Sequence, residues 1–185
     1  AGGGALIDLG VHVLDLALWL MGYPRPVTVC GAAFAKFGPR GQKTKPRDVK
    51  PETFDVDDMG FGFVRFEDGS VLQFESAWAS HREPMQDAYF VRLFGSEAGA
   101  NFYTGAPNGE TVVLFKLIHD QPVEIVPRLP SGVSGHRLAV HHFVDCILQG
   151  KPTESPGEHG LVGLQIIEAI YRSSQQGREV ALNAH

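Results

Sequence analysis

The stretch that decides the fold opens the chain: residues 2–15 read GGGALIDLGVHVLD. Apolar residues continue on nearly every side as far as residue 21, and Gly22 and Pro24 then interrupt them. This pattern predicts a helix over residues 4–21 that ends at a glycine. A helix that is apolar nearly all round is typical of a protein interior, so we expect it to be buried rather than to lie at the surface.

One narrow stripe of this helix is polar. At roughly 100° per residue, its side chains fall within about 60° of one another on one face. They are Asp8, His12, Asp15 and Trp19. A buried carboxylate or imidazole is costly unless it is paired, so the stripe must meet partners or line a cavity. One interpretation is a hydrogen-bonded tether to neighbouring elements, and for Asp15 we favour this structural role.

The other interpretation of the stripe is catalytic. Histidine titrates near neutral pH, so His12 can serve as a general acid or base, with Asp8 one turn away fixing its tautomer. The glycines at positions 2–4 have no side chains, so a ligand can approach the backbone at the start of the helix. From these residues alone, both interpretations stay open.

The rest of the chain predicts a run of strands and two helices. Strands are expected over Thr28–Phe34, Met59–Phe66, Val71–Trp78, Tyr89–Phe94, Thr111–Ile118, Val123–Val126 and, near the end, Glu179–Leu182. Residues 67–70, Glu-Asp-Gly-Ser, are a strong hairpin signal between the second and third strands. Helices are expected over residues 135–149 and 155–176, and Gly38–Phe54 is expected to be a long loop. This order predicts an α+β fold: an open-faced, mostly antiparallel β-sheet with helices packed on one face, in a single domain of residues 1–185.

Several motifs recur in a recognisable order along this pattern. After residues 2–15 come Trp19–Gly22, Phe54–Asp58, Val64–Gly69, Trp78, Ala169–Ser174 and Gly177–Val180. Together they resemble the C-terminal domain of the Gfo/Idh/MocA oxidoreductase family. The resemblance implies a domain that binds substrate and forms oligomers, joined in the same polypeptide to an N-terminal Rossmann domain that binds NAD or NADP. It also implies a sugar, inositol or related polyol as the substrate.

The same resemblance implies an active site. In this family the Asp and His of the opening helix face the nicotinamide and the substrate carbinol, which maps onto Asp8 and His12. A lysine from a Glu-Lys-Pro motif of the Rossmann half completes the site, so either His12 or that lysine accepts the proton. The chain has no Glu-Lys-Pro and no G-x-G-x-x-G after a strand. We therefore expect a fragment without its Rossmann half, which binds no cofactor or metal itself and is inactive alone.

The expected catalytic residues are His12 and Asp8. The expected substrate-binding residues are Gly3, Gly4, Asp8, His12 and His81. His81 is included because it follows a strand end, where a sheet can meet a cleft. Two other functions stay open. A metal-dependent enzyme would use Asp8 and His12 with a third ligand such as His81 or His141, and a non-catalytic scaffold or sensor would keep the fold without the redox half.

Composition narrows the class of partner. Apolar residues make up 43% of the chain and charged residues 20%, which is typical of a globular protein and too apolar for disorder. A net charge of −5 argues against nucleic acid and against an anionic membrane. Three ionisable residues in the most apolar run argue against a membrane span. The chain has only two cysteines, too few for a disulfide scaffold, so a cytoplasmic location is expected.

The expected strands also carry apolar side chains on both faces. Phe61 and Phe63 lie on one face of their strand, and Val64 and Phe66 lie on the other. A sheet covered by helices on one side only should be polar on its open side. We therefore expect a homo-oligomer formed through the open sheet face.

In the helix over residues 135–149, His142 lies opposite the apolar face and is expected at the surface.

Overall fold

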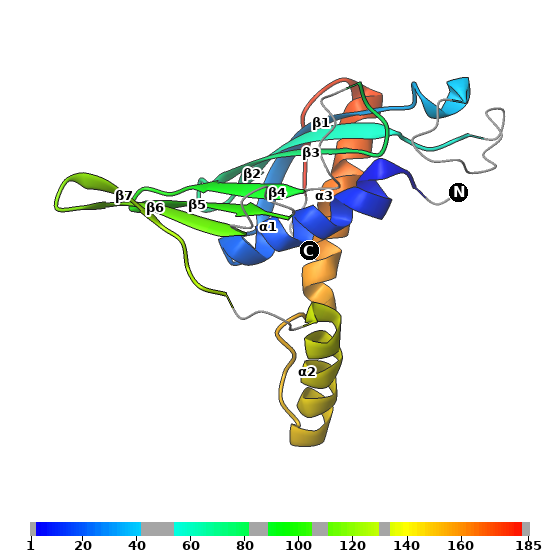
Figure 1. Cartoon of the computed structure of the whole chain (residues 1–185). Helices are drawn as coiled ribbons and strands as arrows, with labels where there is room; N and C mark the ends of the chain where they lie inside the picture. Colours follow the sequence, from blue (N-terminus) through cyan, green and yellow to red (C-terminus); the bar gives the residue numbers. More distant parts are fainter. Residues whose placement is uncertain (1–2, 42–53, 82–88, 105–110, 130–133, 183–185) are drawn as a thin grey trace. The chain divides into compact units, whose positions relative to one another are not determined.

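The computed structural model describes residues 3–41, 54–81, 89–104, 111–129 and 134–182 (Figure 1). The chain forms two compact units. The first comprises Ala1–Pro84 and Glu158–His185, and the second comprises Met85–Gly157. Of the expected long loop, Gly38–Arg40 forms a short 3-10 helix, η2, and residues 42–53 lie outside the described residues.

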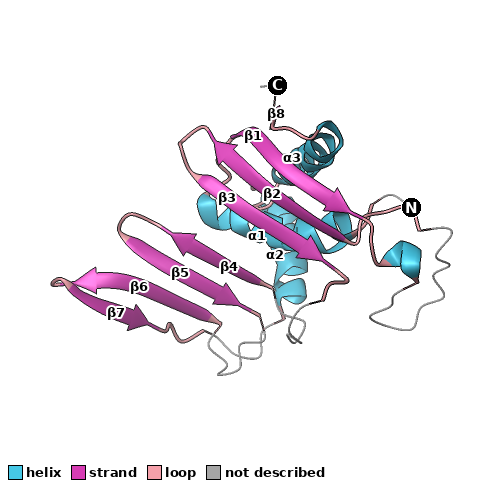
Figure 2. Ribbon diagram, turned by 90° about the horizontal axis from the view of Figure 1, so that it is seen from above, coloured by secondary structure: helices cyan, strands magenta, loops and turns pink. Residues whose placement is uncertain are grey.

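The first unit is built on an antiparallel sheet of four strands in the order β3-β2-β1-β8 (Figure 2). The strands are β1 (Pro26–Phe34), β2 (Met59–Phe66), β3 (Val71–Ala77) and β8 (Val180–Ala181). The expected hairpin joins β2 to β3, and Gly69 in its turn has the left-handed φ of 85° that favours glycine. In the centre of the sheet, Val64 lies opposite Val29 on one side and Leu72 on the other.

Helices cover one face of this sheet and form the core with it. They are η1 (Leu6–Gly10), α1 (Val11–Met21) and α3 (Gly157–Gln176). The fully buried side chains of the core come from all three layers: Leu6, Leu14 and Leu18, Val29 and Val64, and Ile166, Ile167 and Ile170. Serine side chains of α3 also accept hydrogen bonds from β1, Ser173 from the Gly31 amide at 2.9 Å and Ser174 from the Ala33 amide at 3.0 Å.

Among the described residues, no helix of the first unit lies over the other face of its sheet. Along β2, Val64 and Phe66 point into the core, while Phe61, Phe63 and Arg65 are exposed. Phe34 at the end of β1 is also exposed, and its ring meets that of Phe61 edge to face. The expected α+β class, with antiparallel strands and helices on one face, is confirmed.

The second unit holds a separate antiparallel sheet in the order β4-β5-β6-β7. Its strands are β4 (Phe90–Phe94), β5 (Ala98–Tyr103), β6 (Val112–Ile118) and β7 (Gln121–Ile125). The sequence did not predict β5, because AGANFY begins with small residues of low β-propensity. Pairing with both β4 and β6 holds it in place. The described strands thus form two sheets rather than one.

Helix α2 (Gly135–Gln149) also belongs to the second unit, and its exposure reverses the expectation. Its apolar side chains are exposed, with Ile147 at 66% and Leu148 at 77%. His142, expected at the surface, is instead half-buried, because its Nε2 accepts a hydrogen bond from the Glu154 amide at 3.1 Å. Cys146, one turn further on, donates to the Pro152 carbonyl at 3.5 Å. The segment after α2 therefore covers its less apolar side.

Candidate active site

The helix with Asp8 and His12 does not begin as an α-helix. Leu6–Gly10 forms a π-helical turn, η1, and the α-helix starts only at Val11. The ideal α-helical spacing used for the polar stripe therefore applies from Val11 onward and not within the turn that carries Asp8. Short π-helical turns are rare, and many of those that do occur lie at functional sites.

The expectation that this helix is buried all round is also wrong. Leu14 and Leu18 are buried in the core, but the opposite face is exposed. That face, called here the exposed helix face, carries Asp8, Leu9, His12, Asp15, Trp19 and Leu20. Trp19 is 56% exposed. Asp8 and His12 therefore present their polar groups to whatever meets this face, instead of being paired inside the domain.

Asp15 has a structural partner, as expected. Its Oδ1 accepts a hydrogen bond from the Tyr23 hydroxyl at 2.8 Å. Burial, the hydrogen bond to Asp15 and the charge of that carboxylate together raise the pKa of Tyr23 to about 12. Tyr23 also stacks on His159 of α3, with ring centroids 3.6 Å apart. Tyr23, just after the end of the helix, thus contacts α3 through His159, and Asp15 accepts the hydrogen bond of this same tyrosine.

The start of the helix is held by Asp57, which lies just before β2. The Asp57 side chain accepts hydrogen bonds from the Gly4 amide at 3.0 Å and the Leu6 amide at 2.9 Å. A Cβ atom at Gly4 would lie 1.9 Å from the Asp57 carbonyl oxygen, so only glycine fits there. Gly4 was expected to let a substrate approach. In the structure this buried residue lets Asp57 approach, while Gly3 is half-buried beside it.

His81 lies four residues after the end of β3. It is exposed, and its ring meets that of Phe37 edge to face at 5.1 Å. Among the described residues, no hydrogen bond joins His81 to Asp8 or His12. Asp8 itself is linked to Gly4, because the Asp8 amide donates to the Gly4 carbonyl at 2.9 Å. The structure therefore places Gly4 and Asp8 in one hydrogen-bonded turn and gives His81 an aromatic contact with Phe37.

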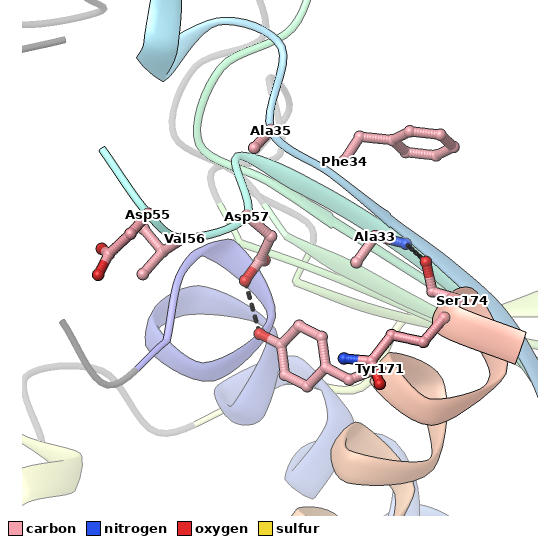
Figure 3. A pocket seen from close by; sticks show the side chains of 9 residues that line it. Ala33, Phe34, Ala35, Asp55, Val56, Asp57, Tyr171 and Ser174 are labelled. Atoms are coloured by element: carbon pink, nitrogen blue, oxygen red, sulfur yellow. Dashed lines mark hydrogen bonds between the residues drawn. The ribbon is translucent and has the colours of Figure 1, made fainter. Parts of the chain in front are cut away.

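A cavity of about 260 Å³ lies beside Asp57 (Figure 3). Its lining includes Phe34, Asp55, Tyr171 and Ser174. Tyr171 of α3 donates a hydrogen bond to Asp57 Oδ1 at 2.5 Å. Sequence reasoning did not single out Asp57 or Tyr171 as functional, although both lie within motifs that carried the resemblance. Partners far apart in sequence leave no spacing signal that would reveal them.

The metal alternative requires a third ligand near Asp8 and His12. Within the parts of the chain that the structure describes, no group of three or more His, Cys, Asp or Glu side chains is arranged to hold a metal ion.

A membrane span requires a long apolar helix. Across the described parts of the chain, no helix is both long and apolar enough to cross a membrane.

Comparison with known proteins decides the family. Residues 1–182 match the Gfo/Idh/MocA family model described as "Oxidoreductase family, C-terminal alpha/beta domain". The chain belongs to this family. A Gfo/Idh/MocA relative, D-glucoside 3-dehydrogenase of Escherichia coli (strain K12), is 30% identical over 187 residues, which cover 98% of this chain and 49% of the relative.

Solved structures agree with this Gfo/Idh/MocA assignment. The aldose-aldose oxidoreductase of Caulobacter crescentus, complexed with glycerol, matches with a TM-score of 0.73 and 25% identity over 98% of this chain and 48% of that one. Levoglucosan dehydrogenase in complex with NADH matches with a TM-score of 0.76 and 20% identity over 100% of this chain and 52% of that one. The chain thus spans about half the length of these relatives and is an oxidoreductase C-terminal domain.

Proposed function

We propose that this chain is the substrate-binding and oligomerisation domain of an NAD- or NADP-dependent dehydrogenase that oxidises a carbinol of a sugar, inositol or related polyol. The observation that carries the proposal is the exposed helix face, where Asp8 and His12 stand unburied on the opening helix of a Gfo/Idh/MocA C-terminal domain. Relatives named as sugar dehydrogenases support the substrate class.

The residues of the exposed helix face fit a nicotinamide and a polyol. A nicotinamide cofactor supplies the hydride acceptor when bound. Asp8 and His12 offer hydrogen-bonding groups to a carbinol, and the exposed Leu9 beside them offers apolar surface to a flat ring. His12 accepts the hydroxyl proton as the hydride leaves, unless a lysine of the nucleotide-binding half takes that role. Asp8 orients the imidazole and stabilises it once protonated.

The nucleotide-binding half is the first partner in this proposal. A dinucleotide pyrophosphate is bound by a glycine-rich turn at a helix N-terminus, and this chain contains no G-x-G-x-x-G sequence. Trp19 and Leu20 leave apolar surface exposed on the same helix as His12. We propose that a Rossmann domain of the same polypeptide covers this surface and completes the site.

A second copy of the chain is the other partner, in a cytoplasmic homo-oligomer. The open face of the first sheet carries Phe34, Phe61 and Phe63, exposed by 37–40%. Large apolar side chains gathered on one open face mark an interaction surface. This arrangement supports the expected oligomer through the open sheet face.

The function is tested by comparing the chain alone with the chain joined to a nucleotide-binding half. Reduction of NAD or NADP at 340 nm is followed with a panel of sugars and inositols. We expect turnover only in the joined protein, and calorimetry should show no cofactor binding by the 185-residue chain alone. Cofactor binding by the chain alone in the micromolar range, a Kd of about 1 μM, would contradict the division of labour. A joined protein that binds cofactor but oxidises none of the panel would contradict the substrate class.

A further inference from the structure

One residue outside the active-site helix, Asp57, accepts hydrogen bonds from the backbone amides at its start. Asp57 accepts hydrogen bonds from three consecutive amides: Gly4 and Leu6 bond to its carboxylate, and Ala5 bonds to its carbonyl at 3.0 Å. Amides at a helix start have no partner inside the helix, and a negative charge there is favoured by the helix dipole. Asp57 therefore supplies both the missing acceptors and the charge.

Tyr171 of α3 holds this carboxylate in turn. Its hydroxyl donates to Asp57 Oδ1 at 2.5 Å, the oxygen that also accepts from Gly4 (Figure 3). Asp57 is only 7% exposed. Burial raises the pKa of Tyr171 well above its usual value, and the hydrogen bond to Asp57 raises it further. The hydroxyl therefore keeps its proton and remains a donor near neutral pH.

The turn held by Asp57 has little room to move. The Ser76 hydroxyl donates to the Ala5 carbonyl at 2.9 Å, so the turn is bonded to β3 as well. A Cβ atom at Gly10, the last residue of the π-helical turn, would lie 2.7 Å from the Phe74 ring. Both ends of η1 thus lie close against fixed groups, with Asp8 between them.

We infer that Asp57, held by Tyr171, is a positioning residue that sets where Asp8 and His12 stand on the exposed helix face. The connection is short. The Asp57 carboxylate accepts a hydrogen bond from the Gly4 amide. The Gly4 carbonyl in turn accepts one from the Asp8 amide at 2.9 Å. His12 follows one turn later, at the start of the regular helix. This inference rests on the proposed function, because it assigns Asp57 and Tyr171 a role in the placement of the catalytic residues.

The test compares two variants, each of which removes the hydroxyl of one residue: Tyr171 and its neighbour on α3, Ser174. Tyr171→Phe, made in the protein that contains its nucleotide-binding half, deletes the bond to Asp57 and keeps the ring. Ser174→Ala, on the same helix and in the same cavity, deletes the 3.0 Å bond to the Ala33 amide instead. We expect Tyr171→Phe to lower kcat by roughly three- to tenfold, the worth of about one hydrogen bond, with the KM for cofactor unchanged. Ser174→Ala should keep kcat at the wild-type level.

The variant Asp57→Asn and an NMR measurement on His12 test the same inference independently. Asp57→Asn leaves one amide without its acceptor and should lower kcat further, by about ten- to a hundredfold. The His12 ring resonance, followed by NMR in labelled protein, should move in Tyr171→Phe and stay in place in Ser174→Ala. This resonance needs no turnover, so it tests Tyr171→Phe even where Asp57→Asn fails to fold.

The outcomes separate this inference from the proposed function. If Tyr171→Phe lowers the Tm but leaves both kcat and the His12 resonance unchanged, Asp57 and Tyr171 only stabilise the fold and the inference is overturned. If the wild-type protein oxidises no sugar, the proposed function fails, and the His12 resonance alone decides the inference. A shift in Tyr171→Phe and none in Ser174→Ala then supports positioning, and no shift in either overturns it.

Discussion

At the scale of single residues, His12 and Asp8 carry the proposed chemistry. Both are exposed, so neither contributes to the core. His12→Ala should lower kcat by roughly 10²–10⁴, the usual effect of losing a positioned acid–base group. Asp8→Asn should also lower kcat, because an amide does not stabilise an imidazolium as a carboxylate does. Steady-state kinetics of the protein with its nucleotide-binding half, together with thermal melting of the same variants, measures both effects.

Asp15→Asn is the matched control for these variants, since Asp15 lies on the same helix face but bonds to Tyr23. It should lower the Tm slightly and leave kcat unchanged. Variants of His12 and Asp8 that melt early and yet turn over normally would show that the two residues are structural, which is the alternative that the sequence left open.

The sequence predicted the polar stripe at this scale but not its surroundings. It singled out Asp8 and His12 as candidates, and it gave Asp15 a structural role, which the hydrogen bond from Tyr23 agrees with. It did not identify Asp57 or Tyr171, because their hydrogen bonds join positions more than 50 residues apart in the chain. It also placed the stripe in the interior, because apolar composition alone does not distinguish a helix buried on all sides from one with an exposed apolar face.

At the scale of elements, the opening helix, the β2–β3 hairpin and α3 were predicted close to their observed bounds. Each has a strong local signal: a sustained apolar period, a Glu-Asp-Gly-Ser turn or a capping sequence. The elements that were missed depend on tertiary contacts. β5 is held by its two neighbours rather than by its own residues, and the π-helical turn forms where Asp57 and β3 constrain the backbone.

The packing of α3 on the first sheet gives a test with a pair of glycines. A Cβ atom at Gly62 of β2 would lie 2.6 Å from Ile170 Cδ1, which is fully buried. Gly62→Ala should therefore cost about 1–3 kcal/mol of stability by overpacking. Gly163 of α3 has open space around its Cβ position, so Gly163→Ala should stabilise the protein by about 0.5–1 kcal/mol through helix propensity. Urea unfolding measures both, and a stabilising Gly62→Ala would show that α3 packs less closely on β2 than described.

At the scale of the whole molecule, the open face of the first sheet is what the proposed oligomer needs. Phe63 is exposed near its centre, opposite Cys30 on β1 and Gln73 on β3. A charge placed there must be desolvated when two copies meet, which costs several times the contribution of the lost ring contact. Phe63→Lys should therefore shift the protein from oligomer to monomer in light scattering at tens of micromolar, about the range in which specific association is detected.

The control for this change is Val71→Lys, at the exposed start of β3. A charge at that edge is more easily kept hydrated than one at the centre of the face, so Val71→Lys should weaken association less. Circular dichroism should show both variants folded, because both side chains point away from the core. If Phe63→Lys stays oligomeric, the copies associate through another surface, and the exposed apolar residues of α2, Phe143 and Ile147 among them, are the next to be substituted.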